Sequence, residues 1–282
     1  MLEFQRKPSW LNKKINLGVC HKLKSLLRDL RLRSVCEESS CPNISECFCN
    51  GVVTFMILGD TCTRECAFCG VNKGRPAPAD SDEPKRIKEA VRRLGLSHVV
   101  ITSPTRDDLS DAGAELFYRT TEAVKSIDSR IRVEILIPDF KGRRDLIKKI
   151  VKSRAEVVAH NLETTASLYL KVRKGADYSR SLEVLRLIKE INQNTFTKSS
   201  LILGLGEKEE EVIQALVDLR QAGCDFLTLG QYLPPSLSHY PLKEYVNPDK
   251  FTFFEQYAGK LEFRGVKSTP YTRSSYLAHT FF

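Results

Sequence analysis

The 282-residue chain has no apolar run long enough to span a membrane. Its longest such run, VVTFMILG at residues 52–59, has the length of a strand. The basic N-terminal stretch lacks the apolar segment of a secretory signal. We therefore expect a cytoplasmic protein that makes no membrane contact, in a compartment where thiols stay reduced. No G-x-G-x-x-G follows the first predicted strand, which weakens a dinucleotide-binding fold.

The net charge of +9 also comes without the features of a nucleic-acid-binding protein. Lys and Arg are spread along the chain and alternate with Asp and Glu, with no arginine-rich tract and no aromatic-rich stacking motif. We expect no nucleic-acid partner, and we assign most charges to solvated helix faces. The basic surplus suits an acidic macromolecular partner.

The cysteines are concentrated between residues 36 and 69, where seven of the nine lie. Six of them form two triplets: Cys36, Cys41 and Cys47, spaced C-x4-C-x5-C, and Cys62, Cys66 and Cys69, spaced C-x3-C-x2-C. Structural zinc takes four protein ligands, usually as two close pairs. A cubane iron–sulfur cluster has four iron corners, so three thiolates leave one iron free for another ligand. The two triplets therefore indicate two [4Fe-4S] clusters.

Two other uses of the cysteines compete with this interpretation. A disulfide framework is disfavoured because the chain shows no signal peptide and its nine thiols are an odd number. A zinc module drawing one pair from each triplet stays an alternative, although the steps of the first triplet are loose for zinc; it would suit a zinc-stabilised nucleic-acid-binding protein. We interpret Cys20, Cys49 and Cys224 as small buried or incidental thiols.

Short apolar runs alternate with longer amphipathic stretches along the chain. The predicted strands are residues 52–59, 97–103, 131–136, 155–160, 197–204 and 225–231. The predicted helices between them are near residues 83–94, 112–128, 143–152, 179–192 and 208–222. This alternation predicts an α/β fold with a parallel sheet wound by right-handed crossovers, either open or closed into a barrel.

Outside this pattern, residues 21–33 carry leucines at helical spacing, which predicts an amphipathic helix packed on the main domain. Around the first cysteine triplet, Pro42 and Asn43 favour turns over a regular element. Polar and glycine residues follow each predicted strand, where active sites of α/β barrels gather.

One family resemblance accounts for both triplets. The second triplet, with Phe68 before its last cysteine, resembles the signature of the radical S-adenosylmethionine (SAM) enzymes. The first triplet and the RSSY motif at residues 273–276 resemble the lipoyl synthase family within that superfamily. The resemblance implies a partial (β/α)6 TIM-like barrel at residues 51–235. It also implies an N-terminal extension at 1–50 and a C-terminal extension at 236–282, which together carry the second cluster site.

The resemblance also implies roles for individual residues. The second triplet would hold the SAM-binding cluster, and the first an auxiliary cluster whose fourth ligand is Ser275. Serine is a hard, weak ligand beside thiolate, so its bond to iron should be the easiest to lose. The candidate SAM contacts are Phe68, Thr102, Asn161, Glu163, Arg173, Gly204 and Gln231. The candidate substrate contacts are Arg106 and Arg273.

Several of these candidates have a structural alternative that the sequence leaves open. Gly204 and Gly206 either let the backbone approach a ligand or form an ordinary strand-to-helix turn. Asn161 and Glu163 suit either ribose binding or a helix cap.

The implied reaction inserts two sulfur atoms at C6 and C8 of an octanoyl chain on a carrier-protein lysine. Those C–H bonds have no acidifying neighbour, so hydrogen abstraction by a radical from SAM is the workable route. The family implies two SAM molecules per product, with sulfur taken from the auxiliary cluster. A two-cluster radical SAM enzyme that inserts sulfur into a related or small-molecule substrate is the nearest alternative.

The same resemblance implies several partners. The substrates would be octanoylated lipoyl carrier domains, such as the E2 subunits of 2-oxoacid dehydrogenases and the H protein of glycine cleavage. A low-potential donor such as ferredoxin or flavodoxin would supply electrons. A repair factor would rebuild the consumed cluster.

Overall fold

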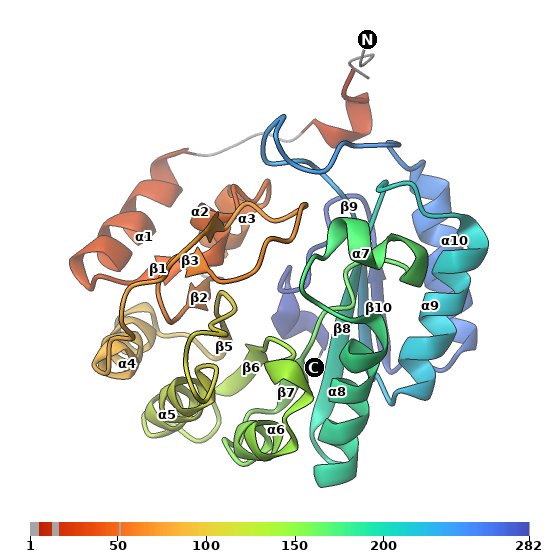
Figure 1. The fold of residues 1–282 in the computed structure, drawn as a ribbon. Coiled ribbons are helices and arrows are strands. Elements are labelled where there is room, and N and C mark those ends of the chain that lie inside the picture. Colours follow the sequence, from red (N-terminus) through yellow and green to blue (C-terminus); the bar gives the residue numbers. More distant parts are fainter. Residues whose placement is uncertain (1–5, 13–16, 51, 282) are drawn as a thin grey trace.

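The computed structural model describes residues 6–12, 17–50 and 52–281. A sheet curves into an arc with helices on its outer side (Figure 1). Its eight strands have the order β1-β2-β5-β6-β7-β8-β9-β10, in which β1 is antiparallel to β2 and all other neighbours are parallel. They are β1 (Arg33–Ser34), β2 (Thr54–Met56), β5 (His98–Thr102), β6 (Arg132–Leu136), β7 (Val157–Ala159), β8 (Phe196–Leu203), β9 (Phe226–Gln231) and β10 (Gly265–Ser268).

The helices fall into two groups. Those on the outer side of the sheet are α4 (Glu83–Leu94), α5 (Ala114–Lys125), α6 (Arg144–Val151), α8 (Tyr178–Ile191), α9 (Glu209–Gln221) and α10 (Pro248–Lys260). The remaining ones are α1 (Leu17–Asp29), α2 (Val35–Glu38), α3 (Ile44–Cys49) and α7 (Tyr169–Val172). The single-turn 3-10 helices are η1 (Ser9–Leu11), η2 (Phe140–Gly142), η3 (Ala166–Leu168) and η4 (Ala278–Phe281). A separate small sheet pairs β3 (Thr61–Cys62) with β4 (Asn72–Lys73).

The predicted fold class is confirmed: the chain forms an α/β partial barrel. Each of the six predicted strands and five predicted helices overlaps an observed element. Strand β10 was not predicted, because its sequence GVKS contains a single large apolar residue. It pairs in parallel with β9 and therefore brings part of the predicted C-terminal extension into the main sheet. The division near residues 50 and 235 stays a prediction, and residues 1–5 and 13–16 of the N-terminal part lie outside the described residues.

The core lies between the sheet and the outer helices. Val99 and Ile101 of β5 are fully buried, and Ile87 and Val91 of α4 are each only 1% exposed. Burying side chains of this kind is the main favourable contribution to folding. Helix ends follow local signals: α4 has Pro84 in its first turn and ends at Gly95, whose φ of +59° is the left-handed conformation that glycine tolerates.

The N-terminal region confirms one expectation and corrects another. Helix α1 buries Leu23 and Leu27 on one face, as its leucine spacing predicted. The expectation of turns around the first cysteine triplet was only partly right. The segment contains α2 and α3, and only Cys41 lies in the turn between them. The Ser34 side chain caps α2 by accepting from the Glu37 N–H at 3.4 Å, a local signal that favours this helix over a loop.

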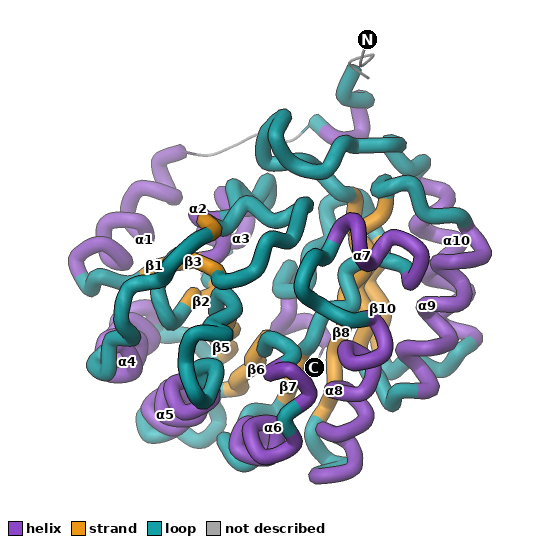
Figure 2. Tube along the Cα trace, in the orientation of Figure 1, coloured by secondary structure: helices purple, strands orange, loops and turns teal. Residues whose placement is uncertain are grey.

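A long loop between β9 and α10 extends over the N-terminal, cysteine-bearing part of the chain (Figure 2). Tyr240 N donates to Ala67 O at 2.8 Å, and His239 Nε2 lies 3.2 Å from Cys69 O. These contacts tie the loop to the second cysteine triplet. None of the helices in the described part of the chain is long and apolar enough to cross a membrane.

The close packing at the end of β9 makes Gly230 a test of this fold. A Cβ built on Gly230 would lie 1.8 Å from Thr272 O, which is backbone and has no room to move alone. We expect Gly230→Ala to destabilise the protein by about 2 kcal/mol or more through overpacking, measured by chemical denaturation. Gly259→Ala in α10 is the matched control, because a Cβ there meets nothing within 4 Å and should be neutral or stabilising. Equal stability of the two variants would contradict the observed packing.

Candidate active site

Both cysteine triplets face a common cavity of about 470 Å³ at the carboxyl ends of the strands. Its size is within the usual range for small-molecule sites. The predicted metal ligands that line it are Cys36, Cys41, Cys47, Cys62, Cys66, Cys69 and Ser275. All nine cysteines of the chain are free thiols. The structure thus brings together every ligand that the sequence predicted, including Ser275 from more than 200 residues away.

Local backbone contacts hold the first triplet. Cys36 lies on α2 and Cys47 on α3, and Cys41 N donates to Cys36 O at 3.0 Å in the turn between them. Burial raises the pKa of Cys36 to about 12, and the neighbouring Cys41 and Cys47 contribute in the same direction. A thiol of this kind stays protonated until a metal replaces its proton.

The second triplet follows β2 and occupies a loop at the cavity edge. Two backbone N–H groups point at the Cys62 sulfur, from Arg64 at 3.4 Å and from Thr105 at 3.3 Å. Hydrogen bonds of this kind stabilise a thiolate ligand of a cluster. Burial raises the pKa of Cys69 to about 12 and raises that of Cys66 as well.

The donor set fits iron–sulfur clusters. In the described part of the chain, no three His, Cys, Asp or Glu side chains converge closely enough to hold one metal ion. The thiolates of a cubane each bind a different iron, so a cluster does not require that convergence. Two cysteine triplets and one serine, reduced and facing a single cavity, are ligands of the right kind and number for two such groups.

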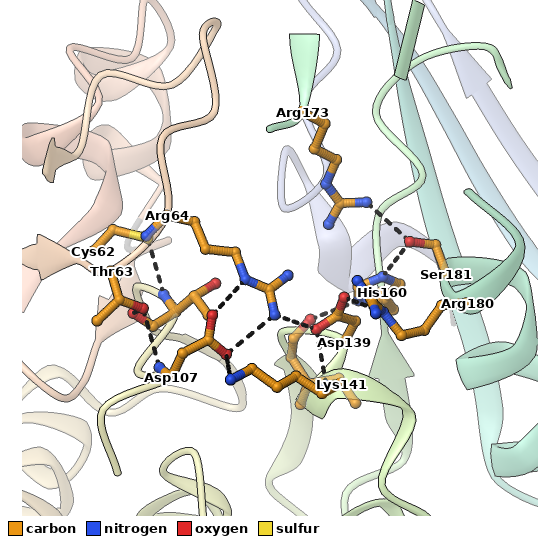
Figure 3. A network of polar contacts seen from close by, with 12 residues as sticks. Cys62, Thr63, Arg64, Asp107, Asp139, Lys141, His160, Arg173, Arg180 and Ser181 are labelled. Carbon is orange, nitrogen blue, oxygen red and sulfur yellow. Dashed lines mark hydrogen bonds and ion pairs between the residues drawn. The ribbon is translucent and has the colours of Figure 1, made fainter. Parts of the chain in front are cut away.

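Arg64, between the first two cysteines of the second triplet, anchors this loop to the barrel (Figure 3). Its guanidinium donates to Asp107 at 2.8 and 3.2 Å and to Asp139 at 2.6 Å. Arg180 on α8 donates to the other Asp139 oxygen at 2.8 Å. Burial opposes ionisation of Asp139, but the hydrogen bonds from Arg64 outweigh it and hold the pKa of that carboxyl well below its usual range.

The RSSY segment is tied to both sides of the cavity. Tyr276 Oη donates to Glu46 Oε2 of α3 at 3.0 Å, and Ser274 Oγ donates to Asn161 Oδ1 at 2.9 Å. Just upstream, Asn43 Nδ2 donates to Tyr271 O at 2.6 Å. These contacts fix the segment on either side of Ser275.

Three predicted SAM contacts form one polar cluster in the cavity. Asn161 Nδ2 donates to Glu163 Oε1 at 3.0 Å, and Arg173 Nη1 donates to Asn161 O at 2.7 Å. Glu163 has a φ of +68°, which is uncommon for a residue other than glycine. Backbone hydrogen bonds to Ser200 O and from Ile202 N hold it there, at 2.8 and 2.9 Å. Burial raises the pKa of the Glu163 carboxyl.

The cavity also contains a polar atom that has no partner. Ser103 Oγ is buried and finds no hydrogen-bond partner among the described residues, and Ser103 lines the cavity. A buried hydroxyl without a partner is costly, so the site fits a polar ligand at this edge. Phe68 and Thr102 line the same cavity, as predicted, and the Thr102 hydroxyl donates to Leu136 O at 3.0 Å.

Comparison with known proteins decides the family. Residues 56–219 match the model of the radical SAM superfamily, and residues 2–41 match that of the N-terminal domain of lipoyl synthase of the radical SAM family. The chain is 51% identical to a lipoyl synthase of Caldicellulosiruptor saccharolyticus, across 97% of this chain and 96% of that protein. It is 50% identical to a lipoyl synthase of Geobacter metallireducens, across 97% and 96%. The chain belongs to the lipoyl synthase family.

A crystal structure of methylornithine synthase shares the fold, with a TM-score of 0.57 and 17% identity over 89% of this chain and 70% of that one. As a member of the lipoyl synthase family, this chain is a radical SAM enzyme of lipoyl cofactor biosynthesis that inserts sulfur.

Two contacts predicted from the family resemblance lie outside the cavity lining. Arg106 does not line the cavity; its buried guanidinium bonds Asp108, Leu58 O and Ala77 O, so it braces a loop. Gly204, with φ of +99°, lies outside the cavity lining as well, and its lack of a side chain makes room for Glu244 O and the Gln231 amide. The structure thus gives both residues supporting roles, and their proposed contacts with substrate and SAM stay predictions.

Gln231 does line the cavity, but the fold uses its amide. Its Nε2 donates to three carbonyl oxygens at 3.0 Å, and its Oε1 accepts from Val246 N at 2.8 Å. We interpret Gln231 as a support for the loop between β9 and α10. Arg273, the other predicted substrate contact, does line the cavity, where burial lowers the pKa of its guanidinium.

Sequence reasoning did not single out Arg64 or Asp107. Two signals were present in the sequence. A charged residue inside a cluster-binding loop needs a buried partner, and Asp107 and Asp139 both follow predicted strands whose ends meet at that loop.

Removing the Arg64 guanidinium should therefore lower the stability of this member of the lipoyl synthase family. We expect Arg64→Met to lower the free energy of unfolding of the metal-free protein by about 3 kcal/mol, since the buried Asp139 carboxylate would keep only the Arg180 ion pair and the Lys141 N–H. The matched control is Arg180→Met, whose side chain is 31% exposed and whose loss should cost about 1 kcal/mol. Urea denaturation measures the free energy of unfolding of both variants. An equal loss of stability in the two would contradict the role of Arg64 as the main anchor of this loop.

Proposed function

We propose that this protein inserts two sulfur atoms, at C6 and C8, into an octanoyl chain carried on the lysine of a lipoyl carrier domain. The observation that supports this most strongly is that both cysteine triplets and Ser275 line a single cavity. Family membership already assigns a radical SAM sulfur insertion with a [4Fe-4S] cluster and SAM. The two-cluster arrangement, the positions of attack and the identity of the acyl group are the parts that we add.

The residues divide into two ligand sets. Cys62, Cys66 and Cys69 would hold the SAM-binding cluster, and Cys36, Cys41, Cys47 and Ser275 would hold the auxiliary cluster. When bound, these groups supply reductive cleavage of SAM and the sulfur for insertion, with two SAM molecules per product for two insertions.

The chain itself orients the ligands and excludes water. Asn161, Glu163 and Arg173 present an amide, a carboxylate and a guanidinium beside Cys66, where they suit the ribose and the charged methionine end of SAM. Phe68 offers an aromatic face for the adenine. The loop between β9 and α10 covers this side of the site through its contacts with Ala67 and Cys69, which limits access of water to a reactive carbon radical.

The partners follow from this reaction. A lipoyl carrier protein as substrate and a reductant are what the family requires. We propose octanoylated E2 and glycine-cleavage H domains as carriers, a ferredoxin or flavodoxin as donor, a cluster repair factor and a cytoplasmic location. The net charge of +9 supports an acidic carrier. A free small-molecule acyl substrate is the alternative, and mass analysis of products from the free acid and from the carrier-bound chain distinguishes the two.

Iron content tests the two ligand sets. Protein reconstituted under anaerobic conditions should contain about eight irons per chain and be brown, since a cubane holds four irons. Cys41→Ala and Cys62→Ala should each retain about half of that iron, because each change disrupts one set. Cys224→Ala is the matched control: its thiol is fully buried away from the cavity and should leave the iron unchanged. A colourless, zinc-loaded protein would contradict the assignment.

Ser275 tests the division of roles. We expect Ser275→Ala to lose sulfur transfer by about a hundredfold or more while formation of 5′-deoxyadenosine continues, because only the auxiliary set loses a ligand. Both products are measured in the same reaction by mass spectrometry. Ser126→Ala is the matched control: it removes an exposed hydroxyl after α5, outside the cavity lining, and should leave both products unchanged. If Ser275→Ala also abolished 5′-deoxyadenosine formation, Ser275 would have to be reassigned.

A further inference from the structure

A buried ion pair lies in the barrel interior directly below the cavity. Lys198 Nζ donates to both oxygens of Glu134 at 2.9 Å, and their side chains are 0% and 1% exposed. Side chains alternate along a strand, so Lys198 shares a face of β8 with Ser200, and Glu134 shares a face of β6 with Leu136. Ser200 and Leu136 both line the cavity. The pair therefore forms part of the floor beneath the active site.

The segment after the RSSY motif ends on this floor. The ring of Phe281 lies over Lys198 Nζ at 4.8 Å and over Lys267 Nζ at 4.2 Å, and it packs on Phe226 with the ring centroids 5.0 Å apart. Figure 1 shows this dark-blue segment inside the arc of strands. Gly265 makes room for the ring, because a Cβ there would lie 2.9 Å from Phe281 Cδ1.

Lys267 holds the backbone that leads to this ring. Its Nζ donates to Leu277 O at 2.6 Å and also to the Thr280 hydroxyl. Leu277 has a φ of +47°, at the point where the chain turns from the cavity toward the floor. Ala278 is fully buried. The segment is therefore held at both ends, by Ser274 and Tyr276 at the cavity and by Phe281 at the floor.

We propose that Phe281 and Lys267 are positioning residues for Ser275. The ring–cation contacts and the Lys267 hydrogen bonds would keep the backbone of this short segment in place, so that the Ser275 hydroxyl stays at the auxiliary triplet. This inference rests on the proposed role of Ser275 as an iron ligand. Serine is a weak ligand beside thiolate, so it cannot hold the segment by itself and other contacts must position it.

Phe281→Ala tests the anchor in the full-length protein. Hydrogen–deuterium exchange of the peptide covering residues 273–281 should speed up by about tenfold, before and after iron loading. The reason is that loss of the ring contacts should raise the equilibrium constant for local opening of the segment by about that factor. After loading, a chelator should remove iron from the auxiliary set about tenfold faster. Sulfur transfer should fall by a similar factor, and 5′-deoxyadenosine formation should be unchanged. Lys267→Met should act in the same direction.

Two controls make the test specific. Phe281→Tyr keeps a ring over the two ammonium groups and should restore slow exchange and sulfur transfer. Phe253→Ala removes a half-exposed ring from α10, away from the segment, and should change none of these readouts. If exchange, iron loss and sulfur transfer are unchanged in Phe281→Ala while Ser275→Ala shows the separation of activities, the anchor is wrong and the ligand assignment stands. If Ser275→Ala does not separate sulfur transfer from 5′-deoxyadenosine formation, the proposed function itself is contradicted.

Discussion

The hydrogen bonds that join the RSSY segment to the two halves of the site are the contacts on which the rest depends. Tyr276 reaches Glu46 on the N-terminal side, and Ser274 reaches Asn161 on the barrel rim. Their sequence separations are 230 and 113 residues. Without this junction Ser275 would not be held at the cavity that both triplets line. A single segment thus makes one site from three distant parts of the chain.

The site concentrates groups that are costly to bury, and its surroundings compensate for them. Burial raises the pKa values of Cys36, Cys66 and Cys69, so these thiols keep their protons until a metal replaces them. Arg64, the buried charged side chain inside the second cysteine loop, is paired with the Asp107 and Asp139 carboxylates of the barrel. Below the cavity, the buried charges of Lys198 and Glu134 likewise compensate each other in an ion pair. Such networks hold a geometry rigidly, which suits chemistry in which a radical must meet one C–H bond and no other.

The fold could be predicted from sequence because its signals are local, and so could the two cysteine triplets that line the cavity. Apolar runs located the strands, amphipathic stretches located the helices, and cysteine spacing identified both triplets. The place of Ser275 at the cavity was predictable only through the family motif, because RSSY by itself is a short polar stretch. Arg106 and Gly204 lie outside the cavity lining for a reason that the sequence does not show: an arginine or a glycine after a strand can brace a loop as well as contact a ligand. Strand β10, Arg64 and Phe281 depend on contacts between distant segments, which spacing does not encode.

The central claim is that the two triplets have separate tasks, one in forming the radical and one in giving up sulfur. The most direct test loads only the auxiliary set with a heavy sulfur isotope, exchanges the medium, and runs a single turnover on octanoylated carrier domain. The account predicts that both sulfur atoms of the lipoyl product carry the heavy isotope, as read from the product mass. A product whose sulfur comes from the medium, with the isotope still on the protein, would contradict it.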